Sequence, residues 1–227
     1  MVSRCFYKTP QGGAWFSAIL PGLGLFMRGF PAQGFSTLAL GGVLTLFTCL
    51  ISQWGGSGVG VFLGMLLILP WWVFQVFQAS LPVPLGLVKS WNIVWSKGYD
   101  IQYLGGLFFL AAITDLSIIL ANPSYHLHVF CTRPTGLPGL LAKIQSPTFH
   151  VIIGYGFLRR RPWALLVYFI YAGYGFLNAT VNFACEGYGR IRIVFFITLL
   201  GFTAYVVLRR HCFHAPSPLA AVPHNNS

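Results

Sequence analysis

Long apolar segments, separated by short polar or charged stretches, make up most of this chain. Four of them approach or exceed the roughly 20 residues that a helix needs to cross the apolar core of a bilayer. They are residues 34–52, 58–79, 101–121 and 162–184, and a fifth, 191–208, is slightly shorter. The pattern predicts an all-α protein built from transmembrane helices.

Two further apolar segments, near residues 12–30 and 145–158, are expected to form short broken or re-entrant helices. Pro21-Gly22 interrupts the first segment before it is long enough to span a bilayer. The sequence therefore predicts a polytopic transmembrane helix bundle of about six spans, in a single integral membrane domain (1–227) with a flexible tail at 211–227.

The segments 12–80 and 145–210 share one order of features. Each begins with a short apolar helix, a Gly-x-Gly, basic residues and a proline, and continues with two spans. One interpretation is an internal repeat, an arrangement common in transporters. The other is chance similarity between glycine-rich apolar segments.

Composition excludes an ordinary soluble domain. Hydrophobic residues make up 56% of the chain and charged residues only 7%, whereas soluble domains carry about 25% charged residues. The net charge of +11 comes from bases at segment ends, which is typical of topology signals and of contact with anionic headgroups. No basic helix or aromatic platform indicates nucleic-acid binding.

Two topologies fit these charges, and both place the two termini in the cytoplasm. In the first, 149–158 only touches the interface, 12–30 crosses fully and the polar stretch 122–148 is cytoplasmic. In the second, 12–30 is re-entrant from the cytoplasm and about 139–158 crosses, so that the polar residues before this crossing lie outside. The second gives the cleaner charge separation, but it puts Lys143 and Pro147 within a short crossing. No removable signal peptide is expected.

Asp115 is the only acid inside any of the long apolar segments. A carboxylate there costs several kcal/mol unless it is paired, protonated or wetted. With Thr114 beside it, and Asn178 and Asn182 one turn apart on another span, it is a candidate proton relay or cation ligand. The alternative is hydrogen bonding that holds helices together. A two-carboxylate mechanism is not expected, because no second membrane carboxylate is present.

Other positions are candidates for packing, anchoring or ligation. Gly56, Gly60 and Gly64 mark one helix face that allows close approach, expected toward 34–52. Arg159, Arg160 and Arg161 are expected to be topology or lipid anchors. Two small clusters contain metal-ligand types without zinc-site spacing: His126, His128 and Cys131, and His211, Cys212 and His214. We assign no metal or cofactor from them. The five cysteines show no disulfide framework and no CxxC motif.

The segment Ala18-Ile-Leu-Pro-Gly-Leu-Gly, followed by Arg28, Gly29 and Gly34, resembles a loose group of small bacterial membrane proteins. Their first helix ends in a P-G-x-G turn, usually followed by a Tyr-x-Gly element that Phe26-Met27-Arg28 replaces here. The resemblance covers about 40 residues. It implies a helix hairpin and a bacterial origin, but no activity. We therefore expect the protein in the bacterial cytoplasmic (inner) membrane.

For function we expect a structural, accessory or assembly subunit of a larger membrane complex, with other membrane subunits as partners. Ionisable groups are rare within the spans, while glycine faces and tryptophans are plentiful. The alternative is a small solute or proton-coupled transporter or channel that uses Asp115. A lipid-modifying enzyme is not expected, because no nucleophile–base pair appears.

Overall fold

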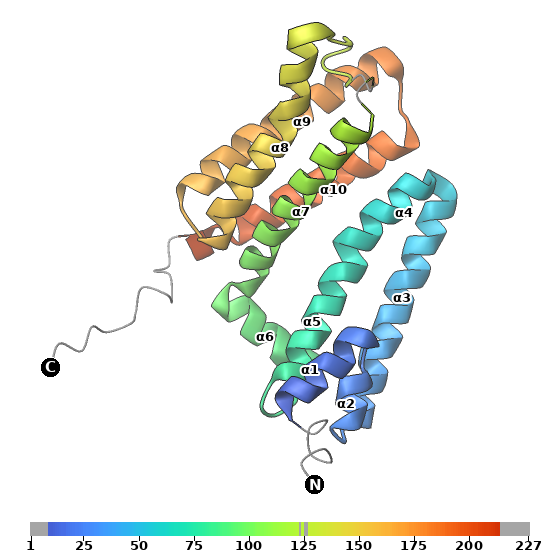
Figure 1. Ribbon diagram of the computed structural model, residues 1–227, viewed down its shortest axis with the longest axis vertical. Helices are drawn as coiled ribbons and strands as arrows, with labels where there is room; N and C mark the ends of the chain where they lie inside the picture. The colour runs from blue at the N-terminus through green and yellow to red at the C-terminus, as the bar shows by residue number, and fades with distance from the viewer. Residues whose placement is uncertain (1–8, 123, 125–126, 214–227) are drawn as a thin grey trace, which may run out of the picture. The chain divides into compact units, whose positions relative to one another are not determined.

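The computed structural model describes residues 9–122, 124 and 127–213, and every long element in them is a helix (Figure 1). Four helices are long and apolar enough to cross a membrane: α3 (Pro31–Gly55), the continuous helix Ser57–Ser80, α7 (Tyr99–Ala121) and α9 (Trp163–Glu186). They coincide with the four long apolar segments of the sequence. The prediction of an all-α protein with membrane-length helices is confirmed.

The contacts within the chain group into two compact units, which are described separately: unit 1 (Met1–Lys97) and unit 2 (Gly98–Ser227). Unit 1 contains α1 (Pro10–Ile19), α2 (Leu23–Met27), α3, α4 (Ser57–Leu63), the π-helix η3 (Gly64–Ile68), α5 (Leu69–Ser80) and α6 (Leu87–Lys97). Unit 2 contains α7, α8 (Gly136–Leu158), α9, α10 (Arg190–Leu208) and the 3₁₀ helix η4 (Arg210–Phe213).

The first apolar segment of unit 1 is broken where the sequence predicts. Helix α1 is capped by Thr9, whose Oγ1 accepts a hydrogen bond from the Gly12 N–H at 3.1 Å. The chain then turns at Gly22, whose φ of +81° is a conformation that favours glycine. Two short helices result, and neither has the length of a span.

Two side chains, Gln75 of α5 and Arg28 at the end of α2, hold the broken segment against α5. Gln75 is fully buried, accepts a hydrogen bond from the Gly22 N–H at 2.9 Å and donates one to the Ser17 carbonyl at 2.7 Å. Arg28 donates to three carbonyls at the C-terminal end of α5, at 2.7–2.8 Å: Ala79, Leu81 and Pro82. Ala79 is in the last turn of α5, and Leu81 and Pro82 follow the helix directly, so Arg28 caps its C-terminal end.

The helix Ser57–Ser80 contains a π-helical turn, Gly64–Ile68, just before Pro70, whose ring nitrogen cannot donate to the helix ladder. Earlier in this helix Gly60 packs against α3, since a Cβ there would lie 2.4 Å from Ser52 Oγ. Gly56 caps α3 with a φ of +93°, and nothing lies within 4 Å of a Cβ at Gly64. Of the three predicted packing glycines, Gly60 is the one whose Cβ position meets a side chain of α3.

In unit 2 the backbones of α7 and α8 approach closely at two glycines. A Cβ at Gly105 would lie 2.8 Å from the Gly154 carbonyl oxygen, and a Cβ at Gly154 would lie 2.9 Å from that of Gly105. The buried core of unit 2 combines side chains of α7, α8, α9, α10 and η4, among them Ile101, Ile153, Phe157, Tyr168, Val206 and Phe213.

The short helix predicted near 145–158 is instead the second half of α8, which runs unbroken from Gly136 to Leu158. Lys143 and Pro147 interrupt the apolar pattern of this segment without interrupting its helix. Pro147 is buried, and such prolines are tolerated when neighbouring helices pack around them.

Candidate functional site

Asp115 of α7 contacts two side chains of α8. Ser146 Oγ donates a hydrogen bond to Asp115 Oδ2 at 2.7 Å, and Nδ1 of His150 lies 3.0 Å from the same oxygen. On the other side of the imidazole, Nε2 of His150 is 2.8 Å from the hydroxyl oxygen of Tyr171 on α9. These four residues, the Asp115 cluster, therefore join three helices of unit 2.

The contact between His150 and Asp115 has the distance of an ion pair but lacks the alignment of a hydrogen bond, since Nδ1 makes none that satisfies the angular criteria. The 3.0 Å separation between Nδ1 and Oδ2 is nevertheless within hydrogen-bonding distance. The His150 side chain is 11% exposed and that of Asp115 28%. The imidazole is therefore nearly buried, while the Asp115 carboxylate is partly exposed at the surface of unit 2.

A carboxylate, an imidazole and a phenol in this order form a chain that can conduct a proton. Imidazole accepts a proton at one nitrogen and releases one from the other at physiological pH. Ring packing holds the chain in place, with Phe108 5.6 Å from His150 and Phe149 5.7 Å from Tyr171 between ring centroids.

Of the four intramembrane polar candidates Asp115, Thr114, Asn178 and Asn182, only Asp115 belongs to this cluster. The hydroxyl of Thr114 donates to the Leu110 carbonyl of its own helix at 2.9 Å. Sequence reasoning missed Ser146 and His150, although a signal was present. They lie four residues apart, one helical turn, which places both on the same face of α8.

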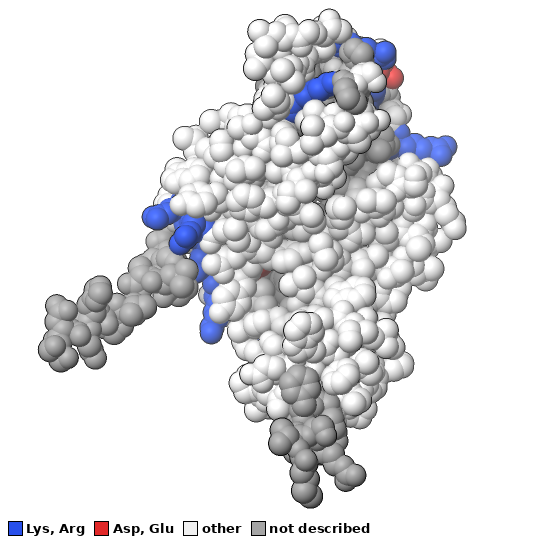
Figure 2. Space-filling model, in the orientation of Figure 1, with Lys and Arg blue, Asp and Glu red and all other residues white. Residues whose placement is uncertain are grey.

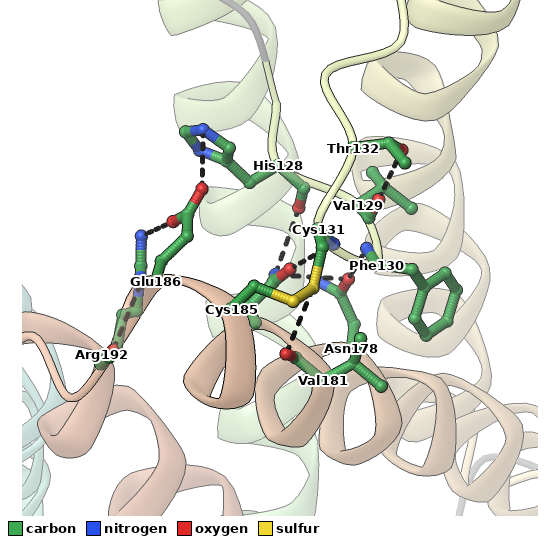
Figure 3. Close-up of a disulfide and its surroundings, with 12 residues drawn as sticks. His128, Val129, Phe130, Cys131, Thr132, Asn178, Val181, Cys185, Glu186 and Arg192 are labelled. Carbon is green, nitrogen blue, oxygen red and sulfur yellow. Dashed lines mark hydrogen bonds and ion pairs between the residues drawn. A yellow bond between two sulfur atoms is a disulfide. The ribbon is translucent and has the colours of Figure 1, made fainter.

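Asn178 and Asn182 hold the loop between α7 and α8 against α9 (Figure 3). Asn178 Oδ1 accepts a hydrogen bond from the Phe130 N–H, and Asn182 Oδ1 accepts one from the Cys131 N–H, both at 2.8 Å. Phe130 and Cys131 have φ values of +46° and +65°, which non-glycine residues adopt at a cost. In this structure the two amides stabilise a strained turn, and neither bonds to Asp115.

The same turn carries a disulfide between Cys131 and Cys185, with 5.9 Å between the Cα atoms (Figure 3). The expectation of no disulfide framework is therefore wrong. A separation of 54 residues and an odd cysteine count hid the pair, because only the fold brings these residues together. As a disulfide, Cys131 offers no thiolate to a metal.

Among the residues that the structure describes, no group of three or more His, Cys, Asp or Glu side chains lies close enough together to hold a metal ion. His126 and His214, members of the two histidine clusters singled out in the sequence, lie outside the described residues.

Glu186 joins two basic side chains next to the disulfide. Its Oε1 is 3.1 Å from Nε2 of His128, and its Oε2 pairs with Arg192 (Figure 3). A cavity of about 330 Å³ opens beside these groups, walled by the two asparagines on one side and apolar side chains of α10 on the other: Phe195, Phe196 and Leu199.

A second polar cluster lies at the opposite end of unit 2. Arg209 binds Asp100 through two hydrogen bonds of 2.7 Å, and the Tyr205 hydroxyl donates to the same carboxylate at 2.6 Å. The Arg209 and Asp100 side chains are only 1% and 4% exposed. Burial favours a lower pKa for Arg209, but the hydrogen bonds and charge of Asp100 outweigh it and raise the pKa above its usual value. The guanidinium therefore stays charged.

The three arginines predicted as anchors differ in their surroundings. Arg159 caps α8, and Arg161 is exposed. Arg160 has a φ of +49°, is only 8% exposed, and lies against Gly98, where a Cβ would be 3.0 Å from its Nη1. Arg160 is thus part of the packing of unit 2.

No family model matches this chain, and neither a curated protein nor a solved structure shows significant similarity to it. Its class rests on its own features. Four helices have the length and composition of membrane spans. On the face shown in Figure 2, lysines and arginines gather in a few patches and leave long flanks without charge. These features define an α-helical integral membrane protein.

Proposed function

We propose that this protein conducts protons within unit 2, as a small proton-coupled transporter or channel, with Asp115 as the group that takes up and releases the proton. The observation that supports this most strongly is the carboxylate–imidazole–phenol chain formed by Asp115, His150 and Tyr171. All three groups exchange protons, and they come from three different helices.

The proposed path follows from the contacts. A proton on the Asp115 carboxyl passes to Nδ1 of His150, and the ring releases its other proton from Nε2 to the oxygen of Tyr171. The Tyr171 hydroxyl in turn gives up its own proton to a water molecule as the next acceptor. The Ser146 hydroxyl stabilises the carboxylate that remains. Each transfer between the three side chains spans no more than 3.0 Å, which is within reach for proton movement between hydrogen-bonding groups.

Asp115→Asn is expected to reduce proton flux by roughly 10²-fold or more, because an amide keeps the shape of the carboxyl but cannot take up a proton at neutral pH. Flux is measured with a pH-sensitive dye trapped in vesicles that contain the purified protein. Thr114→Val is the matched control, because Thr114 bonds only to its own helix, and it should retain normal flux. Full flux in Asp115→Asn would contradict the proposal.

The proposed arrangement has six spans, formed by α3, the helix Ser57–Ser80, α7, α8, α9 and α10. The broken pair α1–α2 does not cross in this proposal. The bacterial cytoplasmic membrane is the proposed location, on the resemblance of the P-G-x-G turn to small bacterial membrane proteins.

A second candidate, an accessory or assembly subunit of a membrane complex, is favoured by a different observation. Gly42, Gly106 and Gly201 lie in long helices, are exposed, and have nothing within 4 Å of the position a Cβ would take. Such positions allow a helix of another protein to approach closely. Purification in mild detergent with mass spectrometry tests this candidate: a stoichiometric partner that Gly106→Leu displaces supports it, and a protein that purifies alone contradicts it.

A further inference from the structure

The disulfide between Cys131 and Cys185 indicates which end of unit 2 faces which side of the membrane. Cys131 lies in the loop between α7 and α8, and Cys185 lies in the last turn of α9. Disulfides persist in oxidising compartments and are rare where cellular reductants keep thiols reduced. We infer that this end of unit 2 faces an oxidising compartment outside the cytoplasm, and that the opposite end, with Arg161 and Arg209, faces the cytoplasm.

Hydrogen bonds around the disulfide hold Cys131 close to Cys185 independently of the bond between their sulfur atoms. The amides of Asn178 and Asn182 hold the N–H groups of Phe130 and Cys131, and the turn closes with two hydrogen bonds between Val129 and Thr132. None of these bonds involves sulfur. They place Cys131 beside the last turn of α9, so the Cα separation of 5.9 Å suits a disulfide.

The distribution of charge agrees with this orientation. The end opposite the disulfide carries five arginines, which follow α8 and α10 and of which Arg209 is paired with Asp100: Arg159, Arg160, Arg161, Arg209 and Arg210. The disulfide end and the first half of α8 carry four bases, of which Arg192 is paired with Glu186 and Arg133 bonds to His128: Arg133, Lys143, Arg190 and Arg192. An excess of basic residues marks cytoplasmic connections, so the charge distribution supports the orientation that the disulfide indicates.

The inference decides between the two topologies that the sequence allows. It places 122–135 outside and makes α8 a crossing helix. At 1.5 Å per residue, its 23 residues extend about 34 Å, enough for a hydrocarbon core of about 30 Å.

The orientation also assigns a side to the Asp115 cluster. Asp115 lies six residues before Ala121, the end of α7 that leads to the disulfide loop, or about 9 Å along the axis. If the proposed function is correct, the carboxylate exchanges protons with the oxidising side. The orientation itself does not depend on that function.

The disulfide is tested in cells that express the full chain. The cells are dissolved in denaturant that contains N-ethylmaleimide, so that every free thiol, including the buried Cys212, is blocked. The protein is then reduced and treated with a maleimide that adds mass to each released thiol. We expect two tags on the native protein and none on Cys131→Ser. A native protein without tags would overturn the inference.

The orientation is tested with two exposed reporter positions that flank α8, Thr135→Cys and Arg161→Cys. Both are placed in a chain that keeps the disulfide and has alanine at the other three cysteines, Cys5, Cys49 and Cys212. In spheroplasts a membrane-impermeant maleimide should label Thr135→Cys at once and Arg161→Cys only after permeabilisation. The reverse order, or equal labelling before permeabilisation, overturns the inference. The result is independent of proton flux, so it stands or fails separately from the proposed function.

Discussion

Replacement of Arg209 by methionine is expected to lower the free energy of unfolding of unit 2 by about 3–5 kcal/mol. Methionine keeps much of the length of the side chain but removes two hydrogen bonds of 2.7 Å and the positive charge beside Asp100. The Asp100 carboxylate, whose side chain is only 4% exposed, would then keep the hydrogen bond from the Tyr205 hydroxyl but lose its counter-ion. A buried charge without its counter-ion is among the most costly defects in a folded protein.

The measurement is unfolding in detergent micelles, followed by circular dichroism as temperature or denaturing detergent increases. Arg210→Met is the matched control, because it removes the same charge from the next residue, which is exposed. It should change stability by less than about 1 kcal/mol. Equal stability of the two variants would show that the Asp100 pair contributes nothing.

The double variant Asp100→Asn with Arg209→Met separates the loss of a contact from the presence of an unpaired charge. Removing both charges of a buried pair is often nearly neutral, whereas removing one partner is destabilising. We therefore expect the double variant to regain most of the stability that Arg209→Met loses. A double variant as unstable as the single one would assign the effect to the shape of Arg209 and not to its charge.

The helices were predictable from the sequence because their signals are local. Apolar runs of membrane length gave α3, α7 and α9, and Pro21-Gly22 marked the break between α1 and α2. These features depend on hydrophobicity and backbone conformation within a few residues, which a sequence displays directly.

The polar contacts were not predictable in the same way, because they join residues that only the fold brings together. Asp100 and Arg209 are 109 residues apart, and Cys131 and Cys185 are 54 apart. In the sequence Arg209 is one of many bases at segment ends, and nothing marks it as buried. His150 was missed for a similar reason, since its neighbours Asp115 and Tyr171 lie on other helices.

A methyl group added at Gly24 is expected to destabilise unit 1 by about 3 kcal/mol or more. The Cβ of Gly24→Ala would lie 1.8 Å from the Gly13 carbonyl oxygen and 2.6 Å from Ser17 Oγ. The carbonyl belongs to the backbone of α1, so α1 and α2 must move apart. That movement also breaks the hydrogen bond of 3.1 Å from the Gly24 N–H to Ser17 Oγ. The small residue in the P-G-x-G turn is thus required by contact between two backbones.

Gly42→Ala is the matched control for this prediction. Gly42 lies within α3 with nothing within 4 Å of its Cβ position, and alanine favours a helix over glycine by about 1 kcal/mol. The local measurement is tryptic cleavage after Arg28, whose guanidinium is held by the carbonyls at the end of α5. Loosening of the α1–α2 turn in Gly24→Ala should accelerate this cleavage, while Gly42→Ala should leave it unchanged. Equal cleavage and equal thermal stability in the two variants would mean that α1 and α2 do not need this close approach, and that the turn is held mainly by Gln75 and Arg28.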